Sequence, residues 1–373
     1  MTDKSKRKSR RSCLVAVIAL IGLCLLLSAA SALSNIGLPA PQTSDRFPEV
    51  DKARLAEALH LKAELGNQIW PGWGGADMPV IVWNSAYEFL FDYPGQPPAG
   101  WELVPDDTFN DQPYYRRPAE NPQNFTMPVG DLWAASMATK VETDAFLIGT
   151  FRDLFPTPIK QIFPYRLLIQ PSETQIGGLL HESFHAYVMQ TAPERLNAAE
   201  DAYQFSVEYN QIAETMQDDW KNEAASLAQA LQTETNDKAA DLVRQFLAQR
   251  AARRQAYDLN PDLISYERQL EWEEGLAKYV EIASLRQASQ TPTYTPLPAM
   301  QADPYFKNYK NFDQRWSQEL IQLRNPSGSS DTRFYMSGMA EAFLLDRLMP
   351  GWKNQALNKG IYLEDLLRQA VGK

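Results

Sequence analysis

Cysteine is nearly absent from this chain. Among 373 residues only Cys13 and Cys24 are cysteines, and both lie within the first 24 positions. The rest of the chain cannot form a disulfide, and it has no thiol for nucleophilic catalysis. Any enzymatic chemistry there must use other side chains.

Positive charge is scarce beyond the N-terminus. Residues 1–11 (MTDKSKRKSRR) contain six basic residues and one acidic residue, while the whole chain has 36 basic and 46 acidic residues. The rest therefore holds 30 basic residues against 45 acidic ones, a net charge of −15. A surface this acidic repels nucleic acids and anionic lipid surfaces, so we predict no nucleic-acid partner.

A long apolar run follows the basic N-terminus. It extends from Cys13 to Leu33 without a charged residue, and about 20 such residues can span a bilayer. Because residues 30–32 (ASA) form a small-x-small cleavage site, residues 1–33 are predicted to be either a signal peptide or an uncleaved membrane anchor. The basic end favours the cytoplasmic side, which predicts an extracytoplasmic body in both cases. Membrane contact is expected only through this segment, if it is uncleaved.

The remaining chain is predicted to be a linker over residues 34–48 and one α+β domain over residues 49–373. A helix is predicted over residues 49–66, ending at Gly66. Between residues 78 and 170, short apolar or alternating runs separated by Pro, Gly, Asn and Asp are typical of the strands of a small mixed sheet. These runs are MPVIVWN, YEFLFDY, WELVP, DAFLIGTF and YRLLIQP.

Helical periodicity dominates residues 177–373, beginning after Gly177-Gly178. Two long amphipathic helices, about 198–232 and 237–257, are predicted to form a hairpin over residues 197–258. The charges of this hairpin are interpreted as a solvated face, with a partner-binding surface as the alternative. Further helices are predicted over residues 262–288, 303–323, 333–349 and 361–371.

Histidine is also rare, yet two of the three histidines lie four residues apart in HESFHAY, residues 181–187. Residues four apart share one face of a helix, so His181 and His185 can bind one metal ion together. Glu182 lies about 100° further round the helix, where it can accept a proton from a metal-activated water. The spacing indicates a zinc site; two surface histidines on a helix are the alternative.

A catalytic zinc ion usually has three protein ligands. The remaining histidine, His60, lies in the predicted helix over residues 49–66 without such a motif, and a surface or half-buried position is expected for it. The third ligand must therefore be a carboxylate from a different helix.

Three patches of the chain, in this order, resemble the gluzincins, the superfamily of thermolysin and the zinc aminopeptidases. They are HESFH (181–185), WEEGLAKYVE (272–281) and FYMSGMAEAFLLDRL (334–348). In that superfamily a glutamate before a glycine is the third zinc ligand, which implies this role for Glu274. The resemblance also implies that Tyr335 donates its hydroxyl to the oxyanion of the tetrahedral intermediate, with packing at a helix start as the alternative.

Glu281 matches an acid of the same helix in the aminopeptidases, and it would hold His181 in one tautomer from the second coordination shell. An exposed helix charge is the alternative for Glu281. Glu200, Glu271 and Glu273 are weaker candidates for the third ligand.

The chain departs from the gluzincin pattern in three ways. His185 and Glu274 are 89 residues apart, more than in those families, and the helical hairpin looks like an insertion in that gap. Glu273 stands where those families often have asparagine. The exopeptidase signature Gly-x-Met-Glu-Asn does not occur in the predicted strands.

The resemblance implies a zincin-like α+β fold, with the motif helix beneath a small mixed sheet and a helical second half closing the cleft. It implies zinc-dependent hydrolysis of peptide bonds, with a peptide or protein as substrate. Two alternatives are a zinc hydrolase of a non-peptide substrate and a non-catalytic binding protein whose helical core is held by zinc. Glu182 argues against the second alternative, because a structural zinc site needs no base.

Overall fold

The computed structural model describes residues 3–326 and 330–372. Within these residues six strands form a mixed sheet of order β3-β4-β2-β1-β6-β5. Neighbouring strands are antiparallel except β1 and β6, which run parallel. The strands are β1 (Val80–Trp83), β2 (Tyr87–Phe91), β3 (Glu102–Leu103), β4 (Tyr115–Pro118), β5 (Phe125–Val129) and β6 (Leu132–Ala138).

The prediction of an α+β chain, with a small mixed sheet followed by a mainly helical half, is confirmed. MPVIVWN, YEFLFDY and WELVP contain β1, β2 and β3. The first two strands are joined by a turn in which the Asn84 side chain accepts hydrogen bonds from the backbone N–H groups of Ala86 and Tyr87, at 2.9 and 2.8 Å. Such a side-chain contact favours a tight reversal between two apolar runs.

Two of the predicted strands are wrong. DAFLIGTF lies in helix α3 (Lys140–Leu154), which begins where Thr139 accepts a hydrogen bond from the Glu142 N–H at 3.4 Å. YRLLIQP begins with a 3-10 turn, η1 (Tyr165–Leu168), and the short helix α4 (Ile159–Ile162) precedes it. Each run contains a large apolar side chain that is exposed, Phe146 at 77% and Leu167 at 79%, so apolar composition alone does not indicate a strand here.

Two predicted helix limits are also wrong: Gly66 does not end a helix, and Gly177-Gly178 does not precede one. Helix α2 (Glu49–Ile69) continues past Gly66, where a Cβ would lie 2.7 Å from the Cα of Gly74. Helix α5 (Ser172–Thr191) begins before Gly177 and Gly178, where Cβ atoms would meet the side chains of Glu281 and Met137 at 3.0 and 2.3 Å. These glycines permit close packing inside or beside continuous helices rather than ending them.

The first half of the predicted hairpin is broken into shorter helices. It consists of α6 (Pro193–Ala202), α7 (Ser206–Ala213) and α8 (Gln217–Gln232), separated by the 3-10 turns η2 (Tyr203–Phe205) and η3 (Glu214–Met216). Helix α9 (Asn236–Ala256) agrees with the prediction and packs on α8. The C-terminal half contains α10 (Pro261–Gln290), the 3-10 turn η4 (Pro298–Ala302), α11 (Phe312–Arg324), α12 (Thr332–Leu348), α13 (Lys353–Ala356) and α14 (Leu363–Val371). The helix predicted from residue 303 begins only at Phe312.

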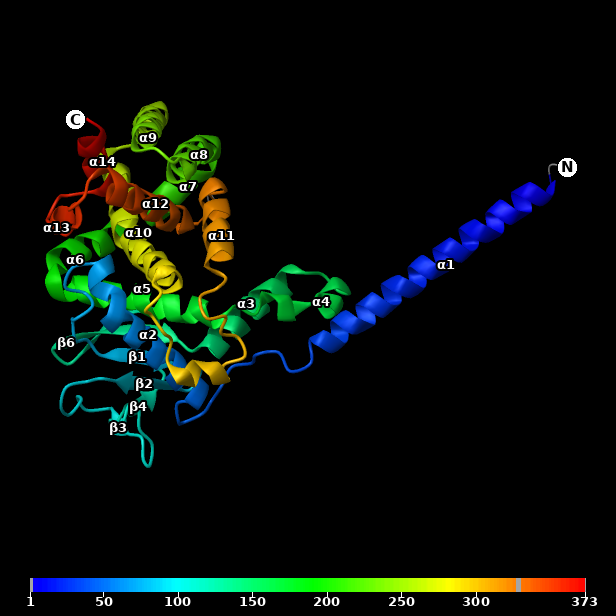
Figure 1. The fold of residues 1–373 in the computed structure, drawn as a ribbon, viewed down its shortest axis with the longest axis horizontal. Helices are drawn as coiled ribbons and strands as arrows, with labels where there is room; N and C mark the ends of the chain where they lie inside the picture. Colours follow the sequence, from blue (N-terminus) through cyan, green and yellow to red (C-terminus); the bar gives the residue numbers. More distant parts are fainter. Residues whose placement is uncertain (1–2, 327–329, 373) are drawn as a thin grey trace.

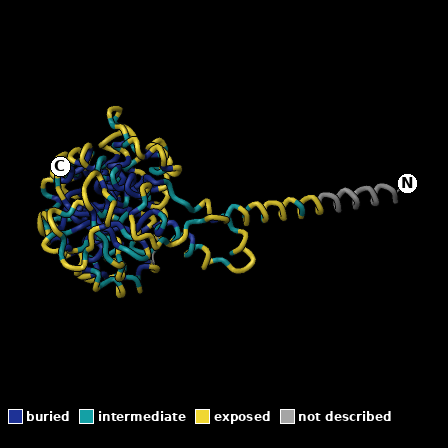
Figure 2. Tube along the Cα trace, turned by 90° about the horizontal axis from the view of Figure 1, so that it is seen from below, coloured by how far each residue is buried: buried dark blue, intermediate teal, exposed yellow. Residues whose placement is uncertain are grey.

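Helix α1 (Asp3–Ser34) projects from this body, and Figure 1 shows it as an extended rod away from the other elements. Its segment Val17–Ser34 is long and apolar enough to cross a membrane, and none of that segment is buried in the body. The exposed colouring along this part of α1 is visible in Figure 2. The helix is therefore suited to a signal sequence or a membrane anchor.

Helix α10 lies at the centre of the helical half and packs on α2, α5, α6 and α12. Its contact with α12 is very close, since a Cβ on Gly338 would lie 2.1 Å from the backbone oxygen of Glu271. A Cβ on Gly275 would lie 2.4 Å from the Cα of Gly338. Only paired glycines allow two helix backbones to approach in this way. The contact places the start of α12, with Tyr335, beside Glu274.

The interpretation of the hairpin charges as a solvated face is wrong for Arg250, which is buried. Arg250 of α9 is 1% exposed and pairs with carboxylates from four helices. These are Glu223, Glu271, Glu341 and Glu364, at 3.2, 2.5, 2.9 and 3.4 Å. Such a network connects the hairpin to α10, α12 and α14.

Replacing Arg250 with methionine is expected to lower the free energy of unfolding by about 3–5 kcal/mol, because several buried carboxylates lose their cation. Arg244→Met is the matched control on the same helix. Arg244 pairs with Asp241 where both side chains are exposed, 50% and 76%, so a loss of only about 0–1 kcal/mol is expected. Urea unfolding followed by circular dichroism measures both variants. Equal losses would contradict a stabilising role for the buried network.

Candidate metal centre

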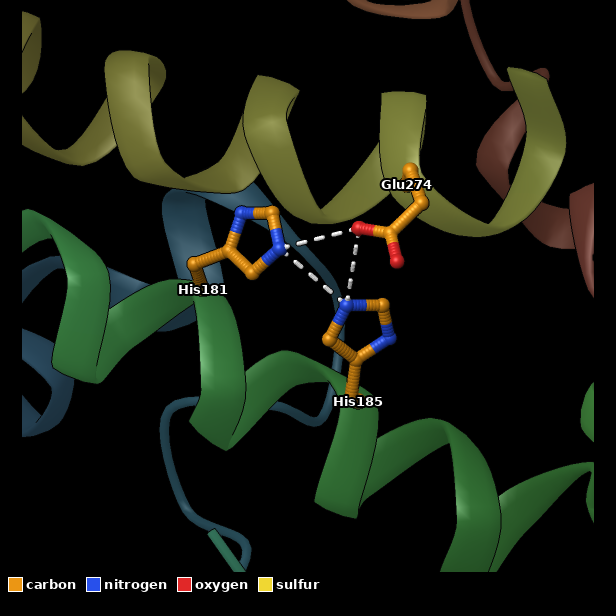
Figure 3. A group of neighbouring side chains, drawn as sticks. All are labelled: His181, His185 and Glu274. Atoms are coloured by element: carbon orange, nitrogen blue, oxygen red, sulfur yellow. Dashed lines mark hydrogen bonds and ion pairs between the residues drawn. The ribbon is translucent and has the colours of Figure 1, made fainter. Parts of the chain in front are cut away.

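Helices α5 and α10 bring together three side chains that could hold a metal ion. His181 and His185 project from one face of α5, one helical turn apart, and Glu274 faces them from α10 (Figure 3). All three are buried, with exposures of 7%, 2% and 6%. Sequence positions 93 residues apart thus meet in one cluster, which we call the trio.

The spacing of the trio fits one tetrahedral ion. The Nε2 atoms of the two histidines are 3.1 Å apart, and Glu274 Oε2 lies 3.2 Å from that of His181 and 3.5 Å from that of His185. Ligands about 2.0–2.1 Å from a tetrahedral zinc ion are separated by about 3.3–3.4 Å. Without an ion, a single proton can bridge only two of these three atoms. A cation at their centre would contact all three.

Electrostatics within the trio favour a positive charge. Burial lowers the pKa of His181, but the facing carboxylates of Glu274 and Glu281 outweigh burial and raise it to about 10. Burial tends to raise the pKa of Glu274, yet His185 and His181 hold it well below its usual range. Burial lowers the pKa of His185 despite the opposing effect of Glu274, which favours the neutral ring with a free lone pair. A metal ligand requires this neutral form.

Glu281 lies behind His181, on the side away from the trio. Its Oε2 is 3.7 Å from His181 Nδ1, and its Oε1 contacts Lys278 Nζ and Arg315 Nη2, each at 2.9 Å. Burial would raise the pKa of Glu281, but Lys278, His181 and Arg315 keep it well below its usual range. An ionised carboxylate here favours a proton on Nδ1, so that Nε2 faces the trio.

Glu182 is half-buried and lines a cavity beside the trio. Burial raises its pKa to about 8, with a further rise from the negative charges of Glu274 and Glu281 and a fall from His181. Its carboxylate belongs to α5 but not to the trio. A pKa close to neutral pH suits a group that exchanges protons with a substrate or a water.

Tyr335 lies over the trio from the start of α12. Its ring stacks on the His181 imidazole at a centroid distance of 5.9 Å and an interplanar angle of 9°. Burial raises its pKa above the usual value, and the charge of Glu274 raises it further, so the hydroxyl keeps its proton. A protonated phenol beside an ion site is a hydrogen-bond donor.

Two residues of the site had no signal in the sequence. The Tyr203 hydroxyl donates to Glu274 Oε1 at 3.4 Å, which leaves Oε2 facing the histidines. Tyr203 occupies turn η2, and a continuous helix was predicted there. Phe125 of β5 packs on His185 with ring centroids 4.7 Å apart. Neither position belongs to a motif, so only the folded chain identifies it.

The trio opens on a cavity of about 430 Å³. Residues from the sheet and from four helices line it, including Glu182, Glu281 and Tyr335. Asn124 and Phe125, at the start of β5, form its wall on the side of the sheet. The edge of the sheet and the trio therefore border the same space.

The other candidate ligands lie elsewhere. Glu271 is held by Arg250 and accepts a hydrogen bond from Ser337 Oγ at 2.6 Å. Glu273 is buried, and its oxygens have no hydrogen-bond partner in the described part of the chain, but they do not join the trio. Glu200 is exposed, and His60 contacts the backbone oxygen of Thr295 at 3.2 Å.

Comparison of the chain with family models, curated proteins and solved structures gives no match. The resemblance to gluzincins therefore depends on the three sequence motifs.

We expect the purified chain to bind one divalent cation. His185→Ala and Glu274→Ala are each expected to weaken binding by more than about 100-fold, because loss of a group that merely orients a ligand already costs about 10–100-fold. His60→Ala is the matched control and should leave affinity unchanged. Titration calorimetry and metal analysis of dialysed protein measure the effect. Metal that stays bound in both trio variants would show that the ion binds elsewhere.

Proposed function

We propose that this chain is a zinc-dependent peptidase with a zincin-like catalytic domain, acting outside the cytoplasm. The observation that carries the proposal is the trio of His181, His185 and Glu274 bordering a cavity that Glu182 also lines. A structural ion would need no acid-base group and no adjacent space. The order of the gluzincin-like motifs along the chain supports the same function.

The donor set favours zinc over other common ions. Two imidazole nitrogens and one carboxylate oxygen, with an open side for a fourth ligand, are typical of catalytic zinc sites. Calcium and magnesium require more oxygen ligands than the trio supplies. When bound at such a site, zinc lowers the pKa of a bound water to about 7 and polarises a carbonyl oxygen.

The chain's own residues would supply the remaining chemistry. Glu182, half-buried in the cavity wall, takes the proton of the attacking water. Tyr335 keeps its hydroxyl proton and donates a hydrogen bond to the oxyanion that develops on the substrate carbonyl. Glu281 fixes the ring of His181, and Tyr203 fixes the carboxylate of Glu274.

A peptide substrate is favoured by the position of β5. This strand lies at the edge of the sheet and, among the described residues, pairs only with β6. Its other edge can pair with an extended peptide through backbone hydrogen bonds. Because Asn124 and Phe125 line the cavity, a peptide on that edge would pass the trio.

The proposed location follows from α1 and the charge distribution. The basic residues 1–11 precede the apolar segment, and this order favours a cytoplasmic N-terminus and an external body. The location is the same whether α1 is removed as a signal sequence or retained as an anchor.

Glu182→Gln and Tyr335→Phe are expected to keep zinc and to lose hydrolysis. The first removes the proton acceptor and should lower kcat by about 10²–10⁴-fold. The second removes an oxyanion donor and should lower kcat by about 10²–10³-fold with little change in KM. Mass spectrometry of a proteome-derived peptide mixture, incubated with zinc-loaded protein, identifies a substrate. The kcat and KM of each variant are then measured with that substrate.

Glu194→Gln is the matched control for these variants, since Glu194 is an exposed glutamate beyond the C-terminal end of α5. It should retain the wild-type rate. Zinc-loaded wild-type protein that cleaves no peptide in the mixture would refute peptidase activity. Full hydrolysis by Glu182→Gln would refute the assigned base.

A further inference from the structure

Large apolar side chains are exposed on one projecting part of the body. We call residues 140–168, which comprise α3, α4 and η1, the arm. Phe146, Leu154 and Leu167 of the arm are 77%, 71% and 79% exposed, and Ile159 and Ile162 are 46% and 37% exposed. Outside α1, Ile36 and the arm, the exposed large apolar residues of the described chain are scattered over separate elements: Val50, Leu103, Val207, Tyr305 and Ile321.

The arm has an internal core, so this exposure is a feature of its fold. Phe163 packs between Phe155 and Tyr165, with centroid distances of 4.7 and 5.1 Å. Tyr165 is buried, and its hydroxyl donates to the backbone oxygen of Lys160 at 3.0 Å. Some aromatic residues of the arm thus hold it together, while other apolar side chains point outward.

The arm is fixed to the end of α1. The Asn35 side chain donates to the Phe163 backbone oxygen at 2.8 Å and accepts from the Tyr165 N–H at 3.0 Å. Arg166 donates to the backbone oxygens of Ser34 and Ile36, each at 2.9 Å. Figures 1 and 2 show the arm projecting from the body beside the point where α1 begins to extend away.

This attachment places the arm at a defined depth relative to a membrane crossed by α1. The apolar segment Val17–Ser34 has 18 residues, which as a helix extend about 27 Å, close to the hydrocarbon thickness of about 30 Å. The arm contacts the last turn of that segment, since the Ser31 hydroxyl also donates to the Ile162 backbone oxygen. It therefore lies where the helix would leave the hydrocarbon region.

The charges of the arm fit the same surface. The arm has four basic and three acidic side chains, in a chain whose net charge is −10. Lys140, Glu142 and Asp144 are buried. The charged side chains of the arm that are not buried are three basic ones and one acidic one: Arg152, Lys160, Arg166 and Asp153. Basic groups among exposed apolar groups are typical of segments that bind at the interface of anionic lipids.

We propose that the arm docks on the lipid surface beside α1, with Phe146, Leu154 and Leu167 inserted among the acyl chains near the headgroups. Two attachments then hold the body, one through the transmembrane helix and one through the arm. A single helix followed by a linker would let the body rotate freely, whereas the arm fixes its orientation over the membrane. This inference is independent of the metal centre.

Spin labels on the full chain test this docking. In a Cys13→Ser, Cys24→Ser background, single cysteines replace Phe146, Leu154 or Leu167 and are labelled after reconstitution into vesicles of equal parts phosphatidylcholine and phosphatidylglycerol. Accessibility to oxygen and to a water-soluble nickel chelate is measured by power saturation. Labels at Leu26 of α1 and at Val207 are the references for lipid and for water, because both side chains are exposed in the structure, 71% each.

Labels on the arm are expected to lose most of their accessibility to the nickel chelate, as the label at Leu26 does, while the label at Val207 keeps it. Adding Leu167→Glu should restore chelate access at position 146, and Val207→Glu should not. Circular dichroism verifies that the variants fold.

Arm labels that are as open to the chelate as position 207, with Leu26 protected, would overturn the proposal. A Leu26 label open to the chelate would also overturn it, since α1 would then not cross the bilayer. Broadening between arm labels that disappears on dilution with unlabelled chain would identify a second copy, rather than lipid, as the occupant.

Discussion

The separation between helices α5 and α10 is the constraint on which the site depends. Glu274 must reach the two imidazoles of α5 within a few tenths of an ångström, because a metal site tolerates little displacement of its ligands. Gly177 on α5 allows Glu281 to approach His181 from α10, and Gly275 lets α12 lie against α10 just beside Glu274. Close packing at glycines thus sets the positions of the polar groups.

The second constraint is charge, which α10 meets differently on its two sides. Toward α5 it presents Glu274 and Glu281, whose negative charges are balanced by His181, Lys278 and Arg315. Toward the hairpin it presents further buried glutamates that pair with arginines of α9. Removing these arginines, or His181, would leave buried carboxylates without a partner, and this would lower the free energy of unfolding. The hairpin is therefore connected to the helix that carries the third candidate ligand.

The parts that the sequence predicts well are those with a strict spacing. The four-residue spacing of the histidines places both on one face of a helix, and the short continuous apolar run Val80–Trp83 forms a strand. What the sequence does not reveal depends on packing between distant segments. The apolar residues of α3 predict a strand of the sheet, because the exposure of Phe146 beside α1 has no local signal in the sequence. Tyr203 reaches Glu274 only because a helix is interrupted at η2, and the burial of Arg250 depends on four separate helices.

X-ray absorption at the zinc edge of the metal-loaded chain tests most directly whether the three side chains coordinate zinc. Coordination by His181, His185 and Glu274 predicts two imidazole nitrogens and one carboxylate oxygen at about 2.0–2.2 Å from zinc, with a light fourth ligand. The scattering from the imidazole rings should fall by half in His185→Ala. A zinc environment without imidazole scattering, or one unchanged in that variant, would contradict the site and the function proposed from it.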